Sequence, residues 1–162
     1  MTGIDKASGS IARDATSARF AGDIRGAQPQ DYSRIAELSR QLGYPSSAEE
    51  IAARLEGMQH SSDHEVFVAA VDGEVAGWLG VYVCRMVETE ARAEISGLVV
   101  DERFRSQRIG WHLLDRAERW ARAKGCGVIG LRSNVIRDRA HAFYQRHGYN
   151  HVKTQKAFRK DL

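Results

Sequence analysis

Three arginines gather in the segment 101–110, between a run of apolar residues that ends at Val100 and an amphipathic stretch that follows it. Arg103, Arg105 and Arg108 all lie in this loop. Where a strand leads into a helix, the first turn of the helix presents unpaired backbone N–H groups and the positive end of the helix dipole. Such a turn binds anions, and guanidinium groups strengthen the attraction for phosphate. The segment therefore predicts a phosphate site, although an ordinary turn with exposed arginines would have the same composition.

Glu94 is the one acidic residue in the apolar run from Ala93 to Val100. Burying a carboxylate without a partner is costly, so its position demands either a function or an ion pair. An arginine at the edge of the sheet could supply that ion pair. Glu88 and Glu90 come shortly before it in a polar loop, where they could attract a cationic substrate.

Hydrophobic periodicity predicts the elements that position these residues. Ser47 and Glu50 form a capping box ahead of a helix, and Asp72-Gly73 is typical of the two-residue turn of a β-hairpin. We expect strands at 21–25, 65–71, 74–83, 93–100, 128–133 and 149–158, and helices at 29–42, 48–59, 107–124 and 138–147. The order β-α-α-β-β-β-α-β-α-β predicts an α/β fold around a mixed (α+β) sheet, with the strands 93–100 and 128–133 parallel.

Composition excludes several classes of protein. The chain has 162 residues, of which 43% are hydrophobic and 28% are charged, as in ordinary globular domains. We expect a single domain at 21–162 after a flexible N-terminal tail at 1–20, which is rich in Ser, Ala, Gly and Thr. The longest strictly apolar run, Val66–Val71, is far shorter than the ~20 residues that span a bilayer. Cys84 and Cys126 are too few for a disulfide framework or a zinc ribbon, so we expect no metal and a cytoplasmic location.

The charges are unevenly distributed along the chain. Residues 1–90 carry a net charge of −6, whereas residues 91–162 carry +9. This asymmetry indicates an anionic partner for the C-terminal half, unless it reflects only a solvated basic face. Nucleic acid would be one such partner, but no platform of interleaved aromatic and basic residues is present. We therefore expect neither nucleic acid nor membrane as a partner, and favour a phosphorylated cofactor.

Two motifs resemble those of a known family. Arg105-x-x-Arg108-x-Gly110 is similar to the acyl-CoA pyrophosphate motif of the GNAT superfamily of N-acyltransferases, which reads Gln or Arg, two residues, Gly, one residue, Gly or Ala. Arg108 departs from this pattern at the first glycine, a replacement that is tolerable if φ is negative there. The stretch Ala140–Tyr149 resembles the signature Ala-x-x-Phe-Tyr-x-x-x-Gly-Phe. The two motifs follow in the family's order, and the order of the elements also fits.

The resemblance implies a GNAT fold and the transfer of an acetyl group from acetyl-CoA to a primary amine of a small molecule or peptide. The amine would attack the thioester directly in a ternary complex. Pantetheine would lie along a bulged strand, which Gly97 would help to form, beside Leu98, Val99 and Val100. The diphosphate would be bound by the loop and helix start, with two further contacts downstream; these cofactor-binding residues are Arg105, Ser106, Gln107, Arg108, Ile109, Gly110, Asn134 and Arg137.

The same resemblance suggests the catalytic groups. An alkylammonium with a pKa of about 10.4 must lose a proton before it attacks, and Glu94 is the candidate base. Glu88, Glu90 or a chain of water molecules could replace it. Tyr144 would protonate or hydrogen-bond the leaving thiolate, unless it only packs against the sheet. His141 would lie one turn earlier on the same face, as a bystander or a helper at the cofactor.

The acceptor is the least determined part. Trp78 and Tyr82 share one face of their strand, where they could line an acceptor pocket or simply pack in the core. The acidic first half suits a cationic acceptor such as a polyamine, an aminoglycoside-like amine, a lysine or a peptide N-terminus. Arg85 or Arg92 near the acceptor would instead favour an acidic acyl group such as succinyl. A non-catalytic acyl-CoA sensor of the same fold is the alternative function, and a homodimer is left open.

Overall fold

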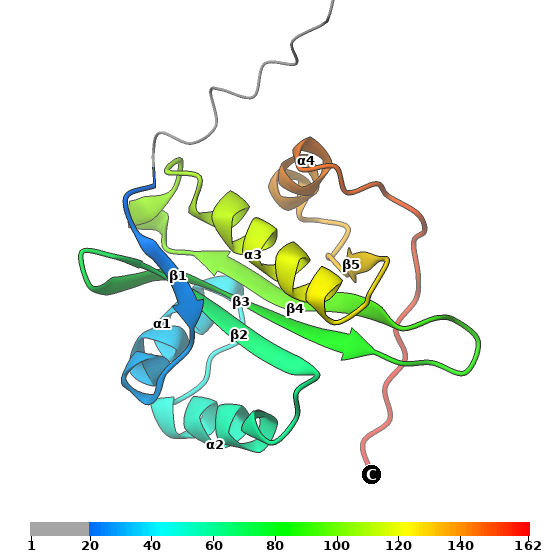
Figure 1. The fold of residues 1–162 in the computed structure, drawn as a ribbon, viewed down its shortest axis with the longest axis horizontal. Coiled ribbons are helices and arrows are strands. Elements are labelled where there is room, and N and C mark those ends of the chain that lie inside the picture. Colours follow the sequence, from blue (N-terminus) through cyan, green and yellow to red (C-terminus); the bar gives the residue numbers. More distant parts are fainter. Residues whose placement is uncertain (1–19) are drawn as a thin grey trace, which may run out of the picture.

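A mixed five-stranded sheet forms the centre of the computed structural model, which describes residues 20–162 apart from the side chain of Gln59 (Figure 1). The strands lie in the order β1-β2-β3-β4-β5, and all neighbours are antiparallel except β4 and β5. Their bounds are β1 (Asp23–Gly26), β2 (His64–Val71), β3 (Glu74–Cys84), β4 (Arg92–Val100) and β5 (Ile129–Leu131). The predicted α/β fold with its parallel crossover pair is therefore confirmed.

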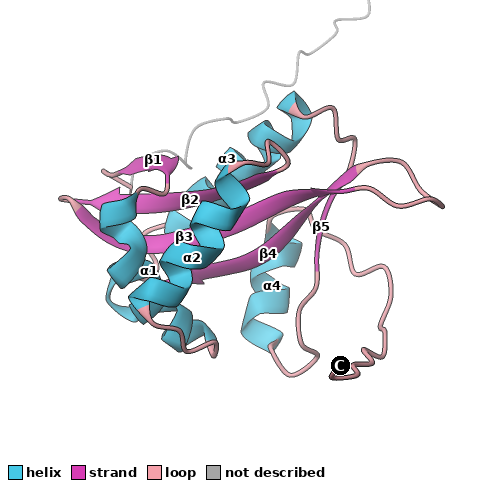
Figure 2. Ribbon diagram, turned by 90° about the horizontal axis from the view of Figure 1, so that it is seen from below, coloured by secondary structure: helices cyan, strands magenta, loops and turns pink. Residues whose placement is uncertain are grey.

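Helices cover both faces of the sheet. The chain forms η1 (Pro29–Asp31), α1 (Tyr32–Leu42), α2 (Ala48–Gln59), η2 (Glu102–Phe104), α3 (Ile109–Ala123) and α4 (Asp138–Arg146). The view in Figure 2 shows α1 and α2 together on one side of the sheet, whereas α3 lies on the other side. The predicted helices are confirmed, although η1 and η2 are short 3-10 turns that the periodicity did not resolve.

Alternation along the strands produces two apolar cores. Val68 and Val99 face α1, where they pack with Leu38 and the other members of one buried cluster. Phe67 and Leu79 have the opposite parity and pack in a second buried cluster that includes residues of α3. Because successive strand residues point to opposite faces, the same strands supply both cores.

Local signals fix the ends of the elements. Ser47 Oγ accepts a hydrogen bond from the backbone N–H of Glu50, and the Glu50 side chain returns one to Ser47, so the predicted capping box starts α2. The hairpin turn at Asp72 and Gly73 has positive φ at both residues, as a two-residue turn of the right twist requires.

The last predicted strand is wrong. Residues 150–162 form no regular secondary structure and all are exposed. Polar side chains interrupt the segment, and Val152 and Phe158 are its only large apolar residues before Leu162. No described residue of the chain buries them. The strand at 128–133 is also shorter than expected, since β5 contains only Ile129–Leu131.

The predicted N-terminal tail, 1–20, lies outside the described residues except for Phe20. This residue belongs with the domain, because its ring packs against the core on the α3 side and lies 4.9 Å from the ring of His112. The prediction that Phe20 is part of the tail is therefore wrong, although the expectation for the rest of the tail stands as a prediction.

Candidate active site

The loop between β4 and α3 adopts a strained backbone. Ser106 and Arg108 both have positive φ, +69° and +62°, although neither is glycine. The condition under which Arg108 would easily replace the family's glycine, a negative φ, is therefore not met. A non-glycine residue in this left-handed region costs roughly 1 kcal/mol. Such turns direct successive backbone N–H groups toward one point, which suits an anion.

The residue at the N-terminus of α3 does not cap the first turn of the helix with its side chain. Arg108 is the N-cap residue and makes no side-chain capping hydrogen bond, so the N–H groups of the following turn point out from the helix start. Ile109 contributes only its backbone here, because its side chain is buried in the core. Gly110 packs against Phe143 of α4. Arg105 is exposed and pairs with Glu102 at 2.8 Å, while Ser106 is exposed and Gln107 half-buried.

A buried ion network holds this loop in place. Asp101 follows β4 and accepts hydrogen bonds from Arg34 of α1 and from the backbone and side chain of Arg103. Glu74 of the β-hairpin pairs with both arginines. Although burial alone raises the pKa of the Asp101 carboxyl, the hydrogen bonds from Arg103 and Arg34 outweigh it and lower that pKa to about 2. The network joins α1, β3 and the loop through two carboxylates, those of Asp101 and Glu74.

A bulge interrupts β4 where the resemblance placed one. Gly97 pairs with Gly80 and Ile95 with Val81, so Ser96 is the extra residue. A Cβ atom on Gly97 would lie 2.9 Å from Cη2 of Trp78, and one on Gly80 would lie 2.5 Å from Oγ of Ser96. Both positions therefore require glycine. β5 pairs with β4 only as far as Ile95, so the two strands share no ladder beyond the bulge.

The three apolar residues after the bulge are core residues by their side chains. Leu98 and Val100 pack against the cluster that includes α3, and Val99 is buried in the cluster beneath α1. Their backbone on the β5 side has no strand partner. These residues can therefore pack in the core through their side chains and still contact a cofactor through their backbone.

Glu94 lies in an ion cluster on the α1 side of the sheet. Arg92 donates from Nε to Oε1 of Glu94 at 2.9 Å, and Nη2 of Arg132 lies 3.6 Å from Oε2. The ion pair considered from the sequence is therefore present. Arg132 also donates to the hydroxyl of Tyr82 at 3.4 Å, and the Tyr82 ring stacks on His64 at 5.7 Å. The side chain of Arg132 is 75% exposed, whereas that of Glu94 is buried.

Arg132 is the residue that the sequence analysis missed. It directly follows β5, where Gly130 pairs with Glu94 and Leu131 with Ile95, so the parallel register brings Arg132 close to Glu94. A basic residue at the end of a strand parallel to the one bearing Glu94 was the available signal. The register had to be known before that signal could be read.

The predicted acceptor residues lie on β3 and on the loop between β3 and β4. Trp78 and Tyr82 lie on the α1 side of β3, as the parity required, and the Nε1 atom of Trp78 is buried without a hydrogen-bond partner among the described residues. Glu88 and Glu90 lie on the exposed loop between β3 and β4. After the hydrogen bond to Glu94, the charge of Glu88 also helps to raise the pKa of the Arg92 guanidinium, so Glu88 lies within electrostatic reach of the Glu94 cluster. Arg85, in the same loop, pairs with Asp63.

Tyr144 packs on α4 beside two other aromatic rings. Its centroid lies 5.3 Å from that of Phe143 and 5.9 Å from that of Tyr149, and it contacts the core on the α3 side. Burial raises the pKa of the Tyr144 hydroxyl, and the nearby charge of Arg137 only partly opposes this. The hydroxyl therefore stays protonated at neutral pH and can donate a hydrogen bond.

The segment between β5 and α4 is held by local bonds. Asn134 Oδ1 accepts from the backbone N–H of Ile136 at 3.2 Å, as in a turn, and its carbonyl lies 3.0 Å from Nε2 of His141. Arg137 donates from Nη2 to the carbonyl of Leu42 at 2.9 Å. This bond links the start of α4 to the end of α1.

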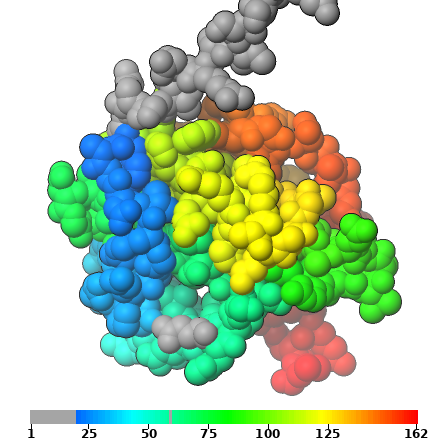
Figure 3. Space-filling model, viewed as in Figure 1, coloured from blue at the N-terminus to red at the C-terminus, as the bar shows by residue number. Residues whose placement is uncertain are grey.

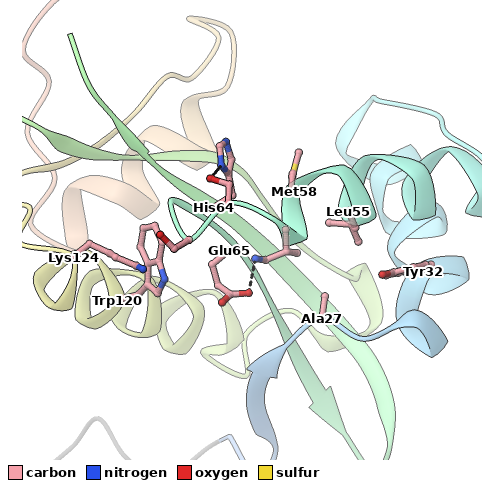
Figure 4. A pocket seen from close by; sticks show the side chains of 11 residues that line it. Ala27, Tyr32, Leu55, Met58, His64, Glu65, Trp120 and Lys124 are labelled. Carbon is pink, nitrogen blue, oxygen red and sulfur yellow. Dashed lines mark hydrogen bonds between the residues drawn. The ribbon is translucent and has the colours of Figure 1, made fainter. Parts of the chain in front are cut away.

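A cavity of about 320 Å³ lies elsewhere, beside the start of β2. Figure 4 shows Trp120 and Lys124 of α3 on one side of it and Leu55 and Met58 of α2 on the other, with Glu65 between. None of the residues predicted from the sequence lines it. The cavity is therefore separate from the elements that carry the two motifs.

The described part of the chain has neither a cluster of metal ligands nor a membrane-spanning helix. No group of three or more His, Cys, Asp or Glu side chains there could hold a metal ion. No helix described in this chain has the length and apolar character needed to cross a bilayer. Both cysteines are free, Cys84 half-buried and Cys126 buried.

Known proteins are similar to this chain in sequence and in fold. The model of the acetyltransferase (GNAT) family matches residues 32–149. An aminoalkylphosphonate N-acetyltransferase from Salmonella typhimurium is 33% identical over 145 residues, which are 83% of this chain and 90% of that protein.

Solved structures extend the likeness of the fold. Glucosamine-6-phosphate N-acetyltransferase from Arabidopsis thaliana superposes with a TM-score of 0.75 at 23% identity, covering 86% of this chain and 99% of that one. The aminoglycoside acetyltransferase AAC(6')-Iy, in complex with the bisubstrate analogue CoA-S-monomethyl-acetylneamine, gives 0.77 at 19% identity, covering 87% and 99%. An aminoglycoside 6'-N-acetyltransferase from Acinetobacter haemolyticus gives 0.76 at 18% identity, covering 86% and 99%.

Proposed function

The chain belongs to the acetyltransferase (GNAT) family and is an N-acetyltransferase, and on this premise we propose that it moves an acetyl group from acetyl-CoA to a small primary amine that also carries an anionic group. The observation that carries the proposal is the pair of arginines on either side of Glu94, one of them largely exposed. Membership of a family of catalysts also favours an enzyme over the non-catalytic sensor.

Acetyl-CoA would bind along β4 and at the start of α3. The uncapped first turn of α3 would bind the diphosphate through its N–H groups, and Arg105 would exchange Glu102 for a phosphate. Asn134 and Arg137 would make secondary contacts to the cofactor. The complex of AAC(6')-Iy with a CoA analogue supports this mode of binding for the fold.

The bulge would orient the thioester. Beyond Ile95 the backbone of β4 has no partner on the β5 side, so N–H and C=O groups near Leu98 could bond pantetheine as an added strand. A backbone N–H beside the acetyl carbonyl would stabilise the oxyanion that forms when the amine attacks.

The acceptor would be bound by the exposed arginine. Arg132 would leave Glu94 Oε2 and pair with the anionic group of the acceptor, because a guanidinium binds phosphonate, phosphate or carboxylate with two parallel hydrogen bonds. Arg92 would keep Oε1 of Glu94 in place. The curated relative is named for an aminoalkylphosphonate, which has both an amine and an anion. A polyamine would instead bring only cations toward two arginines.

Glu94 would then be the base. Once Arg132 turns to the acceptor, Oε2 could take a proton from the ammonium, directly or through water. The free amine attacks the acetyl carbonyl and the C–N bond forms. The C–S bond of the tetrahedral intermediate then breaks, and the second proton on the nitrogen passes to the departing thiolate or to water. Tyr144 would donate a hydrogen bond to the departing thiolate. Since burial raises the pKa of Tyr144, complete proton transfer to a thiolate is uphill, and the hydrogen bond is its main contribution.

Turnover with a panel of amines tests the proposal. Release of free CoA would be measured with 2-aminoethylphosphonate, β-alanine, spermidine and an uncharged alkylamine. We expect kcat/KM to be highest for the phosphonate and lowest for spermidine. Arg132→Ala should raise KM for the phosphonate roughly 10- to 100-fold, the value of a charge-assisted pair, and leave the uncharged amine nearly unaffected.

A matched variant controls for the loss of a surface charge. Arg122 is also an exposed arginine in an ion pair, but it lies on α3, so Arg122→Ala should leave every KM unchanged. Spermidine as the best substrate would indicate a cationic acceptor instead of an anionic one. Equal KM changes in both variants would contradict a direct contact between Arg132 and the acceptor. Absence of turnover with every amine would contradict the proposed donor or acceptor class.

A further inference from the structure

The cavity beside the start of β2 lies just beyond the end of β1. β1 ends at Gly26, and Ala27 donates from its N–H to the carbonyl of Val66 at 2.8 Å before the chain turns into η1. The end of α2, the segment 61–66 and the last turn of α3 line the cavity. In Figure 3, α3 is the yellow surface, and the turquoise surface below it belongs to α2 and the residues that follow. The volume of about 320 Å³ is at the lower end of the roughly 300–1,000 Å³ that small-molecule pockets occupy.

Glu65 provides a carboxylate in this cavity. Its Oε1 accepts a hydrogen bond from the backbone N–H of Val66 at 3.1 Å, and the carboxylate forms no ion pair with a described basic residue. Figure 4 shows the Glu65 side chain in the middle of the cavity, between the residues of α3 and those of α2. Glu65 is half-buried, so water screens its charge less than that of an exposed carboxylate. The cavity therefore attracts a cation.

The indole ring of Trp120 already contacts a cation. Nζ of Lys124 lies 5.6 Å from the centroid of this ring, within the range of cation–π attraction. The Lys124 side chain is chemically a butylammonium ion attached to the backbone, so it shows which kind of group the ring accepts. Because Lys124 is exposed, its side chain can turn out to water and leave the ring to another cation.

The end of α3 favours the same sign of charge. Lys124 is the C-cap residue of α3, so the negative end of the helix dipole lies next to the cavity. Across the cavity from Trp120, the half-buried Leu55 and the more exposed Met58 supply apolar side chains. The cavity thus combines a carboxylate, an aromatic face and an apolar wall.

We propose that this cavity is a second ligand site, which binds an alkylammonium ion. The positive head lies between the Glu65 carboxylate and the Trp120 ring, in place of the Lys124 ammonium, and the alkyl chain lies against Leu55 and Met58. Aromatic faces are established binding elements for quaternary ammonium ligands. The site is separate from the proposed site of acetyl transfer, so it does not depend on the nature of the acceptor.

Titration with butyltrimethylammonium tests the proposal, because this ion has no N–H bond and cannot be acetylated. The amide and indole N–H signals of the full chain would be followed by NMR. We expect saturable shifts at residues 61–66 and at the Trp120 indole, with a dissociation constant of roughly 1 mM for an ion of this size. Glu65→Gln should weaken binding roughly 10-fold, because the charge is removed. Lys124→Ala should strengthen it about 5-fold, because the internal competitor for the ring is lost.

Two matched variants control for the overall charge. Glu49→Gln and Arg119→Ala each remove an exposed charge, from α2 and from α3 respectively, at positions that do not line the cavity. Both variants should bind the probe as the wild type does. If they change its affinity as much as Glu65→Gln and Lys124→Ala do, the effects come from the net charge and the proposal is overturned.

Three further outcomes would contradict an alkylammonium site. Tighter binding of pentanoate, an anion of similar length, would make the cavity an anion site around Lys124. Shifts at Glu94 and Leu131 in place of those at Trp120 would put the probe in the proposed acceptor site. Wild-type protein without saturable shifts, or unchanged affinity in Glu65→Gln, would leave the cavity without this ligand.

Discussion

Glu94, near the start of β4, and Asp101, just after its end, are both buried carboxylates that lie between two arginines. The arginines make the difference. Arg34 also donates to the carbonyl of Val75 and pairs with Glu37 and Glu74, so it is committed on several sides. Arg132, beside Glu94, is largely exposed and donates a further hydrogen bond to the hydroxyl of Tyr82. A buried ion pair is thus structural where its cation is committed elsewhere, and available for chemistry where its cation can leave.

The largest expected effect on activity comes from a substitution of Glu94. Glu94→Gln should lower kcat roughly 1,000-fold, because the amide can still accept from Arg92 but cannot take a proton. The loss should be greatest at low pH, where most of the amine is protonated, and the affinity for CoA should be retained. Steady-state kinetics between pH 6 and 9 with calorimetry of CoA binding measure both. Wild-type turnover across that range would exclude Glu94 from the mechanism.

Asp101→Asn should have the complementary effect, on stability. Removing one partner from a buried pair leaves the remaining charge uncompensated, and we expect a loss of about 3 kcal/mol in the free energy of unfolding. Glu94→Gln should lose less than half of this, because the arginine that it leaves unpaired, Arg132, is 75% exposed to water, whereas Arg34 beside Asp101 is 20% exposed. Urea denaturation of both variants gives the two values. Equal losses would remove the distinction between the two carboxylates.

The pH dependence of the free energy of unfolding measures how much the ion pairs of Asp101 stabilise the fold. The pKa of Asp101 is lowered in the folded state to about 2, so its stabilisation is present above its unfolded value of 3.8 and is lost as the pH falls through about 2. The wild-type free energy should therefore decline between about pH 4 and pH 2 more steeply than that of Asp101→Asn. Parallel curves would show that the Asp101 pairs contribute no net stability.

Tyr144→Phe tests whether the chemistry extends to α4. The ring and its packing against Phe143 and Tyr149 remain, so stability should change by no more than about 1 kcal/mol. The thiolate loses its donor, and kcat should fall roughly 100-fold. Both KM values should be nearly unaffected, since the hydrogen bond strengthens as charge develops on sulfur. Full kcat in the variant would leave Tyr144 as a packing residue.

Arg108→Gly should have the smallest effect, and in the opposite direction. Glycine adopts positive φ without penalty, so the variant should gain roughly 1 kcal/mol in stability. The affinity for CoA should stay the same or increase, because a backbone without a side chain approaches phosphate more closely. Calorimetry and thermal unfolding measure these changes. Weaker CoA binding would instead assign the Arg108 guanidinium a direct contact with phosphate.

Elements with local signals could be predicted from the sequence. The capping box at Ser47, the turn at Asp72-Gly73 and the glycine after α1 each depend on neighbours within four residues, and all are present in the structure. The signal for the loop at 101–110 is equally local, because the start of α3 and the three arginines of the loop are contiguous in the sequence. The strand at 149–158 failed because a strand needs a partner, which the segment itself does not specify.

The site divides in the same way. Trp78 and Tyr82 could be placed on one face by parity alone, and the structure agrees. Arg132 could not be placed, because its proximity to Glu94 depends on the register between two parallel strands joined by the long crossover at residues 101–128. The positive φ of Arg108 was also inaccessible, since the residue type favours the opposite sign.

The facing glycines of the bulge have an evolutionary consequence. Gly80 and Gly97 lie opposite each other, and any side chain at either position would collide with Ser96 or with the ring of Trp78. A single substitution is therefore selected against even when it leaves every proposed catalytic group in place. Relatives that change acceptors would vary the loop after β5 freely while these two codons stay fixed. A saturation library scored for the amount of folded protein would show this as intolerance at positions 80 and 97, whereas position 132, largely exposed, would tolerate substitution in that assay.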